Sequence, residues 1–189
     1  MAAAACTVPT LRATLREATG AAHDRLDSAM RRTGWSDRTS YGEFLRIQHD
    51  ARAPLETWFA GSQVGNAVPP AQCGLLQDDL HALALEGVRK EGREFHMPEG
   101  GDPVGIAWVL AGSSLGNLAI LREIERAGNA HWPISFLCDP AIRAFWKVLR
   151  ERLDTPLDNA IDPHAAVLAA TSAFDHFAAC MDERAREAA

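Results

Sequence analysis

Apolar residues recur every three or four positions along most of this 189-residue chain, which is the spacing of the buried face of an α-helix. The first such run starts after Thr10, a residue type that caps helix N-termini, and stops at Gly34, a residue type that ends helices. The apolar positions between them are Leu11, Leu15, Ala18, Ala22, Leu26 and Met30. The pattern predicts a first helix between Thr10 and Gly34.

Two further helical runs follow in the first half of the chain. Ser40 and Glu43 have the spacing of a capping box, and they predict the start of a second helix that continues to Phe59. Pro54 lies inside this run and predicts a kink. A third helix is expected to hold the leucines of 75–85, and the polar, glycine-rich segment 87–101 is expected to be mostly irregular.

Aspartate followed by proline occurs three times in the second half of the chain, at Asp102, Asp139 and Asp162. Aspartate caps a helix and proline suits its first position, so each pair predicts a helix start. No alternating strand pattern appears in the sequence. The expected fold class is therefore all-α, with one multi-helix domain over residues 10–186 that follows a flexible N-terminal tail, residues 1–9.

The predicted helix over 102–128 carries small and polar residues in its middle. They are Gly112, Ser113, Ser114, Gly116 and Asn117. Glycine inside a helix costs about 1 kcal/mol relative to alanine, and serine hydroxyls compete for backbone carbonyls. Two glycines one turn apart open a flat-sided groove, which suits either a closely packed helix or a large planar ligand. The spacing alone does not separate these interpretations.

The composition of the chain limits the classes of partner that it is expected to bind. The formal net charge is −6 at pH 7, and no Lys/Arg block reverses it locally, so we expect no nucleic-acid partner. The four cysteines are scattered without a C-x-x-C pair, which favours a reducing compartment and a cytoplasmic protein. The uncharged run 103–121 is about long enough to cross a bilayer. Its small polar residues dilute that signal and no second run accompanies it, so we expect no membrane association.

Of the seven histidines, His23 is the strongest candidate for a metal ligand. It lies on a partly apolar face of the first helix, and Asp27, one turn later, could hold its second ring nitrogen. An ordinary interfacial histidine is the other interpretation. The sequence contains no complete motif of a di-iron bundle, a zinc site, a phosphate-binding loop or a serine hydrolase.

Several of these stretches together resemble the biliverdin-producing heme oxygenases, especially the bacterial branch. The first helix, LREATGAAHDRLD, is similar to the family's proximal helix, and WVLAGSSLGNLAI is similar to its distal helix. WKVLRERLD and FDHF resemble its C-terminal helices. The similarity in layout extends from about Leu11 to Met181.

The resemblance implies a role for each matching residue. The expected catalytic residues are Gly112, Ser113 and Gly116, and the expected heme-binding residues are Arg16, His23, Asp27, Asn117, Lys147 and Arg150. His23 would ligate the heme iron, with Asp27 orienting its ring. The two glycines would let the distal helix approach the porphyrin, and Ser113 would hydrogen-bond dioxygen. The three basic residues would bind the heme propionates.

The implied function is oxidative cleavage of heme by dioxygen to biliverdin, carbon monoxide and ferrous iron, with heme as both cofactor and substrate. The electrons would come from a separate ferredoxin or flavoprotein reductase. Ser113 stands where some branches have an aspartate, and Asn117 replaces a usual glycine, so the distal water arrangement and the site of ring opening stay open. Two alternatives also stay open: a heme carrier or sensor with this fold but no turnover, and a helical interaction domain without heme.

Overall fold

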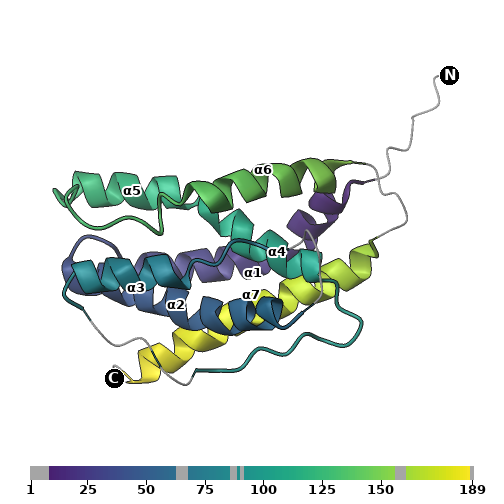
Figure 1. The fold of residues 1–189 in the computed structure, drawn as a ribbon, viewed down its shortest axis with the longest axis horizontal. Helices are drawn as coiled ribbons and strands as arrows, with labels where there is room; N and C mark the ends of the chain where they lie inside the picture. Colours follow the sequence, from purple (N-terminus) through teal and green to yellow (C-terminus); the bar gives the residue numbers. More distant parts are fainter. Residues whose placement is uncertain (1–8, 63–67, 86–88, 90–91, 156–160, 188–189) are drawn as a thin grey trace.

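Helices make up most of the chain in the computed structural model, which describes residues 9–62, 68–85, 89, 92–155 and 161–187 (Figure 1). The α-helices are α1 (Leu11–Thr33), α2 (Arg38–Ala60), α3 (Cys73–Ala82), α4 (Pro103–Gly112), α5 (Asn117–Arg126), α6 (Pro140–Asp154) and α7 (Pro163–Glu187), and a short 3-10 helix, η2 (Ser113–Leu115), joins α4 to α5. No strand occurs in these residues, so the predicted all-α class is confirmed. The predicted tail lies outside the described residues, except for Pro9.

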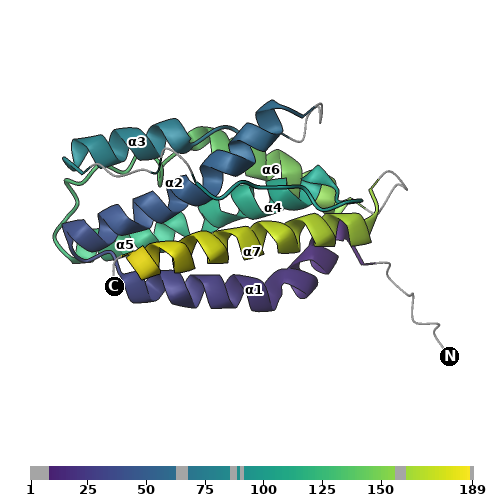
Figure 2. The same ribbon diagram turned by 90° about the horizontal axis from the view of Figure 1, so that it is seen from below.

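Helix α7 is the element on which much of the fold packs. Helices α1, α2 and α4 all lie against it, and Figure 2 shows α1 running alongside α7. Helix α6 contacts both α1 and α4, while α3 packs on α2. The inward face of α7 carries four fully buried alanines, Ala166, Ala169, Ala170 and Ala173. Small side chains on this face let the neighbouring helices approach closely.

Most of the predicted helix boundaries are observed. Thr10 Oγ1 accepts a hydrogen bond from the amide of Ala13, and α1 ends at Gly34, which has a φ of 78°. The three aspartates that precede prolines accept hydrogen bonds from amides in the first turns of α4, α6 and α7. Local residue chemistry therefore sets these four helix starts.

Two of the predicted boundaries are wrong. The capping box at Ser40 does not form, because Asp37 caps α2 and accepts hydrogen bonds from the amides of Thr39 and Ser40. The helix therefore begins two residues earlier than Ser40 and continues as helix past Pro54 to Ala60. Helix α3 ends at Ala82, before the leucines at 83 and 85 that were expected to belong to it.

The stretch predicted as one helix over 102–128 is two helices joined by η2. The hydroxyls of Ser113 and Ser114 donate to carbonyl oxygens three residues earlier, at 2.8 Å and 2.6 Å. These bonds compete with the regular helical pattern and accompany the tighter 3-10 turn. The small residues of the sequence thus mark a break in the helix.

Within the described residues, Pro103–Arg126 is long and apolar enough to cross a membrane by length and composition alone. Its first half belongs to the buried core, where Val104, Ile106, Ala107 and Leu110 are at most 2% exposed. The interior of the fold therefore accounts for the apolar character of α4 without a membrane.

Candidate functional site

Three glycines along α4, η2 and α5 differ in what surrounds them. A Cβ on Gly105 would lie 2.0 Å from a backbone oxygen of α7 and 2.7 Å from a backbone nitrogen, so close helix packing requires this glycine. A Cβ on Gly112 would meet only the ring of Trp146, at 3.7 Å. A Cβ on Gly116 would meet only the carbonyl of Ser113, at 3.5 Å. Both of these distances are ordinary van der Waals contacts.

Backbone conformation does not require glycine at these two positions either. Gly112 has φ −62° and ψ −31°, and Gly116 has φ −74° and ψ −23°, in the right-handed helical region that every residue adopts. Ser113, Leu115 and Gly116 are exposed. Among the residues that the structure describes, neither packing nor backbone strain explains the two glycines. They leave an open face along the break in the helix.

His23 presents its ring at the surface of α1, with 64% of the side chain exposed. The ring meets Phe174 of α7 edge to face, with 6.3 Å between the centroids. Nδ1 lies 3.3 Å from a carboxylate oxygen of Asp24, and Nε2 makes no hydrogen bond with any residue that the structure describes. Nε2 is therefore the ring nitrogen that can serve as a metal ligand.

Asp27, the predicted partner of His23, is engaged elsewhere. Its carboxylate accepts a hydrogen bond from Nε of Arg31 at 2.9 Å, one turn later on α1. Asp24 takes the place beside the imidazole that was expected for Asp27. All of these side chains are exposed. The role of Asp27 in orienting His23 stays a prediction.

The middle of α7 connects His23 to the break between α4 and α5. Phe174 contacts His23, and Phe177, about one turn later on α7, lies 5.9 Å from the guanidinium carbon of Arg52. Nη2 of Arg52 donates to Oγ of Ser113 at 2.6 Å. Since α1 and α4 also both pack on α6 and α7, His23 and Ser113 lie around the same stretch of α7.

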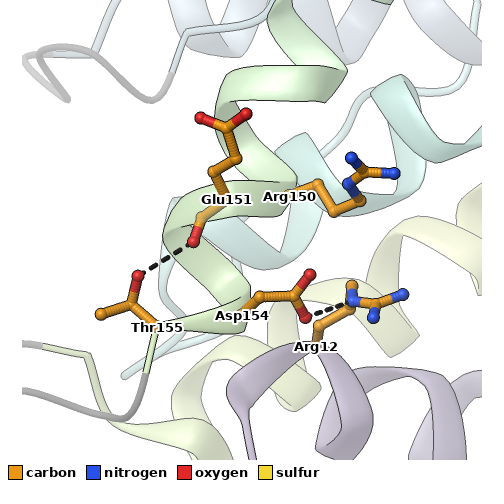
Figure 3. Close-up of a pocket in the computed structure, with 5 residues that line it drawn as sticks. All are labelled: Arg12, Arg150, Glu151, Asp154 and Thr155. Carbon is orange, nitrogen blue, oxygen red and sulfur yellow. Dashed lines mark hydrogen bonds and ion pairs between the residues drawn. The ribbon is translucent and has the colours of Figure 1, made fainter.

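Two pockets lie near the start of α1, and one of them extends to the end of α6. One, of about 440 Å³, is lined by Arg12, Arg150, Glu151, Asp154 and Thr155 (Figure 3). The other, of about 370 Å³, is lined by Arg12, Ala13, Arg16 and Glu17. Figure 3 shows Arg12 and Arg150 extending toward the same side, with Asp154 bonded to Arg12.

Two of the three predicted propionate-binding residues therefore line these pockets, Arg16 and Arg150, while exposed Lys147 lines neither. Neither pocket is lined by His23, which lies about two helical turns beyond Arg16 on α1. Arg12 lines both pockets and was missed from the sequence. It lies one turn before Arg16 on the same face of α1, but the resemblance that implied a role for Arg16 implied none for Arg12.

The predicted pocket residue Asn117 is buried at the start of α5. Its Nδ2 donates to the carbonyl of Leu137 at 3.2 Å, which ties α5 to the loop before α6. This bond uses one of the two amide protons of Asn117 in the fold itself. A role for Asn117 in heme binding stays a prediction.

Arg52 and Gln48 of α2 also lie at this site and were missed from the sequence. Both are buried, and Nε of Arg52 donates to Oε1 of Gln48 at 3.3 Å. The sequence did contain a sign of both residues, because the helical spacing places them on the same buried face of α2 as Leu45 and Leu55. Polar residues at such positions are the informative exceptions to an apolar helix face.

The residues present fit a bound heme in three respects. His23 offers a ring nitrogen of the kind that ligates heme iron. Gly112 and Gly116 leave their backbone uncovered where a flat ring system could approach. Arg12, Arg16 and Arg150 offer cations for carboxylate groups.

The chain is similar to a protein of known structure, although sequence comparison finds no relative. No protein-family model and no curated protein sequence matches the chain. The chain is similar to the NO- and CO-bound heme oxygenase from Neisseria meningitidis, with a TM-score of 0.71 and 19% sequence identity. The match covers 93% of this chain and 92% of that chain. At this identity the similarity establishes the fold, which is that of a bacterial heme oxygenase.

Proposed function

We propose that this protein is a heme oxygenase that cleaves heme with dioxygen and external electrons to biliverdin, carbon monoxide and ferrous iron. The observation that carries the proposal is the pair of glycines at the helix break, which neither the chain's own packing nor its backbone conformation requires. On a heme oxygenase fold, these glycines share a stretch of α7 with an exposed imidazole. Such an arrangement suits a planar group that carries a metal.

The proposed roles of the chain's residues follow from their positions. Nε2 of His23 ligates the iron, and Asp27 or Asp24 holds the opposite ring nitrogen. Gly112 and Gly116 admit the ring system against bare backbone, and Ser113 offers a hydroxyl beside it. Arg16 and Arg150, joined by Arg12 and Lys147, bind the two propionates. Bound heme supplies the iron that activates dioxygen and the porphyrin that is oxidised.

We further propose that residues 10–186 act as one helical domain in the cytoplasm. The reaction needs electrons, and the sequence contains no dinucleotide-binding motif. A separate ferredoxin or flavoprotein reductase is therefore the proposed electron donor. The exposed arginines at the mouth of the two pockets are consistent with a partner that carries acidic groups.

The first experiment is an absorption titration of the purified protein with hemin, followed by addition of a reductant in air. We expect a saturable one-to-one Soret band that decays while a broad red biliverdin band grows. A Soret band that survives the reductant would instead indicate the alternative function, a heme carrier or sensor. Absence of any saturable band would contradict heme binding altogether.

The same titration tests His23. In His23→Ala the iron loses its protein ligand, so we expect weaker hemin binding and no biliverdin formation. The matched control is His81→Ala, which removes an exposed histidine of α3 and should leave both readouts unchanged. An unaltered Soret band and biliverdin yield in His23→Ala would show that His23 is not the ligand.

A further inference from the structure

Arg52 is among the most deeply buried side chains of the protein, although it carries a charge. It lies on α2 and is 1% exposed. Burial lowers the pKa of its guanidinium to about 10, so the group stays charged at neutral pH. A buried charge is costly unless it is paired or has a function that needs it.

The guanidinium of Arg52 makes its direct contacts with neutral groups. Nε donates to Oε1 of Gln48, and Nη2 donates to Oγ of Ser113 at 2.6 Å. The rings of Phe136 and Phe177 lie 5.1 Å and 5.9 Å from its central carbon. Oγ of Ser113 donates its own proton to a carbonyl of α4, so its lone pair is directed to Arg52. These contacts fix the guanidinium at the helix break.

No carboxylate of the described residues forms an ion pair with Arg52. The groups that raise the pKa of Arg52 against this burial are Glu56, Cys73 and Asp139, and each acts on it only through space. Each of these carboxylates is already engaged with other groups: Glu56 accepts from the amides of Gln72 and Cys73, and Asp139 accepts from the side chain of Gln72 and an amide of α6. Arg52 is therefore a buried cation without a bonded counter-ion.

A second buried arginine shows the ordinary arrangement in the same molecule. Arg184 of α7 is 9% exposed, and its Nε lies 2.6 Å from a carboxylate oxygen of Asp50 on α2. That pair neutralises both charges inside the fold. The contrast indicates that the charge of Arg52 is left free for something that the chain itself does not supply.

We propose that Arg52 is an anion-binding residue of the heme pocket, whose guanidinium binds a small anion held at the Gly112–Gly116 break. The inference rests on the proposed function, because the anion would bind beside a heme that His23 would hold. The anchor of Arg52 is Ser113, the first residue after Gly112, which places the charge at the open backbone.

The probe is azide, an anionic ligand of ferric heme, and imidazole is the neutral reference ligand. Each is titrated into the hemin complex at pH 7 with spectroscopic detection. In Arg52→Met, which removes the charge but keeps an unbranched side chain, we expect the dissociation constant of azide to rise at least about tenfold, as for loss of a charged hydrogen bond. The constant for imidazole should change by less than about twofold on the same basis.

Two further substitutions of Arg52 and one control substitution elsewhere complete the experiment. Arg52→Lys keeps the charge and should give an intermediate azide affinity, since it loses the planar fork of donors. Arg122→Met removes an exposed arginine from α5 and should leave both affinities unchanged. Arg52→Gln makes the same neutral change if the methionine variant does not fold, because its amide nitrogen stands near the position of Nε and can still donate to Gln48.

The outcomes separate the two proposals. A wild-type protein that forms no hemin complex overturns the proposed function and this inference together. A wild-type complex whose azide preference over imidazole is unchanged in the neutral variants overturns this inference alone. Arg52 would then serve only to tie α2 to the helix break, and only the free energy of unfolding would respond to its removal.

Discussion

The two ends of α4 carry glycines for different reasons. Gly105 lies where α4 crosses α7, and a single added carbon would collide with the backbone of α7. Gly112 and Gly116 lie where α4 gives way to η2 and α5, and an added carbon there would make only ordinary contacts. The same residue type thus meets a requirement of packing at one end and none at the other.

Small residues in a buried helix are therefore of two kinds, those that packing requires and those that it does not. A glycine that the fold needs has a neighbour inside the distance of a Cβ contact, as Gly105 has. A glycine that the fold does not need still costs about 1 kcal/mol of helix stability relative to alanine. Gly112 and Gly116 carry that cost although no described neighbour requires a glycine there, which is the reason for proposing a ligand beside them.

The largest effect is expected for Gly105→Ala. The new methyl group would force α4 and α7 apart along their whole contact, since both colliding atoms are backbone atoms. Overpacking of this kind costs about 3 kcal/mol, more than the gain in helix propensity of about 1 kcal/mol. Urea denaturation of the heme-free protein would measure the loss.

The control for this substitution is Gly74→Ala in α3, where nothing lies within 4 Å of a new Cβ. It should leave the free energy of unfolding equal or slightly higher. If Gly105→Ala proved as stable as Gly74→Ala, close packing of α4 on α7 would not be the reason for the glycine. The contrast between the two ends of the helix would then disappear.

A second effect is expected at the other end, in Gly116→Leu. Its side chain would stand in the open space at the helix break, so hemin affinity should fall by at least about tenfold. The free energy of unfolding should change by less than about 1 kcal/mol, because the backbone is already helical there. Hemin titration and urea denaturation of the same preparation separate the two quantities.

The matched control is Ala119→Leu, which adds a large side chain at an exposed position of α5. It should alter neither hemin affinity nor stability. Normal heme turnover in Gly116→Leu would mean that no ligand uses the space beside Gly116.

Much of the fold could be predicted from the sequence, because the patterns that indicate its helices are local. The spacing of apolar residues and the three Asp-Pro pairs depend only on neighbours along the chain, and they gave the helices and four of their starts. The cap of α2 was misassigned to Ser40 because Asp37 offers the same chemistry three residues earlier. Such choices between neighbouring caps depend on where the tertiary structure ends the preceding loop.

The candidate site was harder to predict from the sequence, because its residues come together only in the folded chain. The sequence singles out the two glycines, which break a local helix rule, and His23, which lies on a partly apolar helix face, and their roles at the site stay predictions. It could not identify Arg12 or Arg52 as partners, because Arg12 meets α6 and Arg52 meets Ser113 across 142 and 61 residues of sequence. It also could not distinguish Gly105 from Gly112, because only the distance to α7 separates them.

The smallest effect, and the most direct test of the comparison, is expected in Gly112→Ala and Gly116→Ala. Each should raise the free energy of unfolding of the heme-free protein by about 0.5 to 1 kcal/mol, because alanine favours the helical backbone already present. Gly128→Ala is the opposite control, since φ there is 81° and alanine should cost about 1 kcal/mol or more. Thermal or urea denaturation of the three variants would rank them. A loss of stability in both Gly112→Ala and Gly116→Ala would mean that the chain's own packing needs these glycines, whereas a gain accompanied by weaker hemin binding would assign them to the ligand.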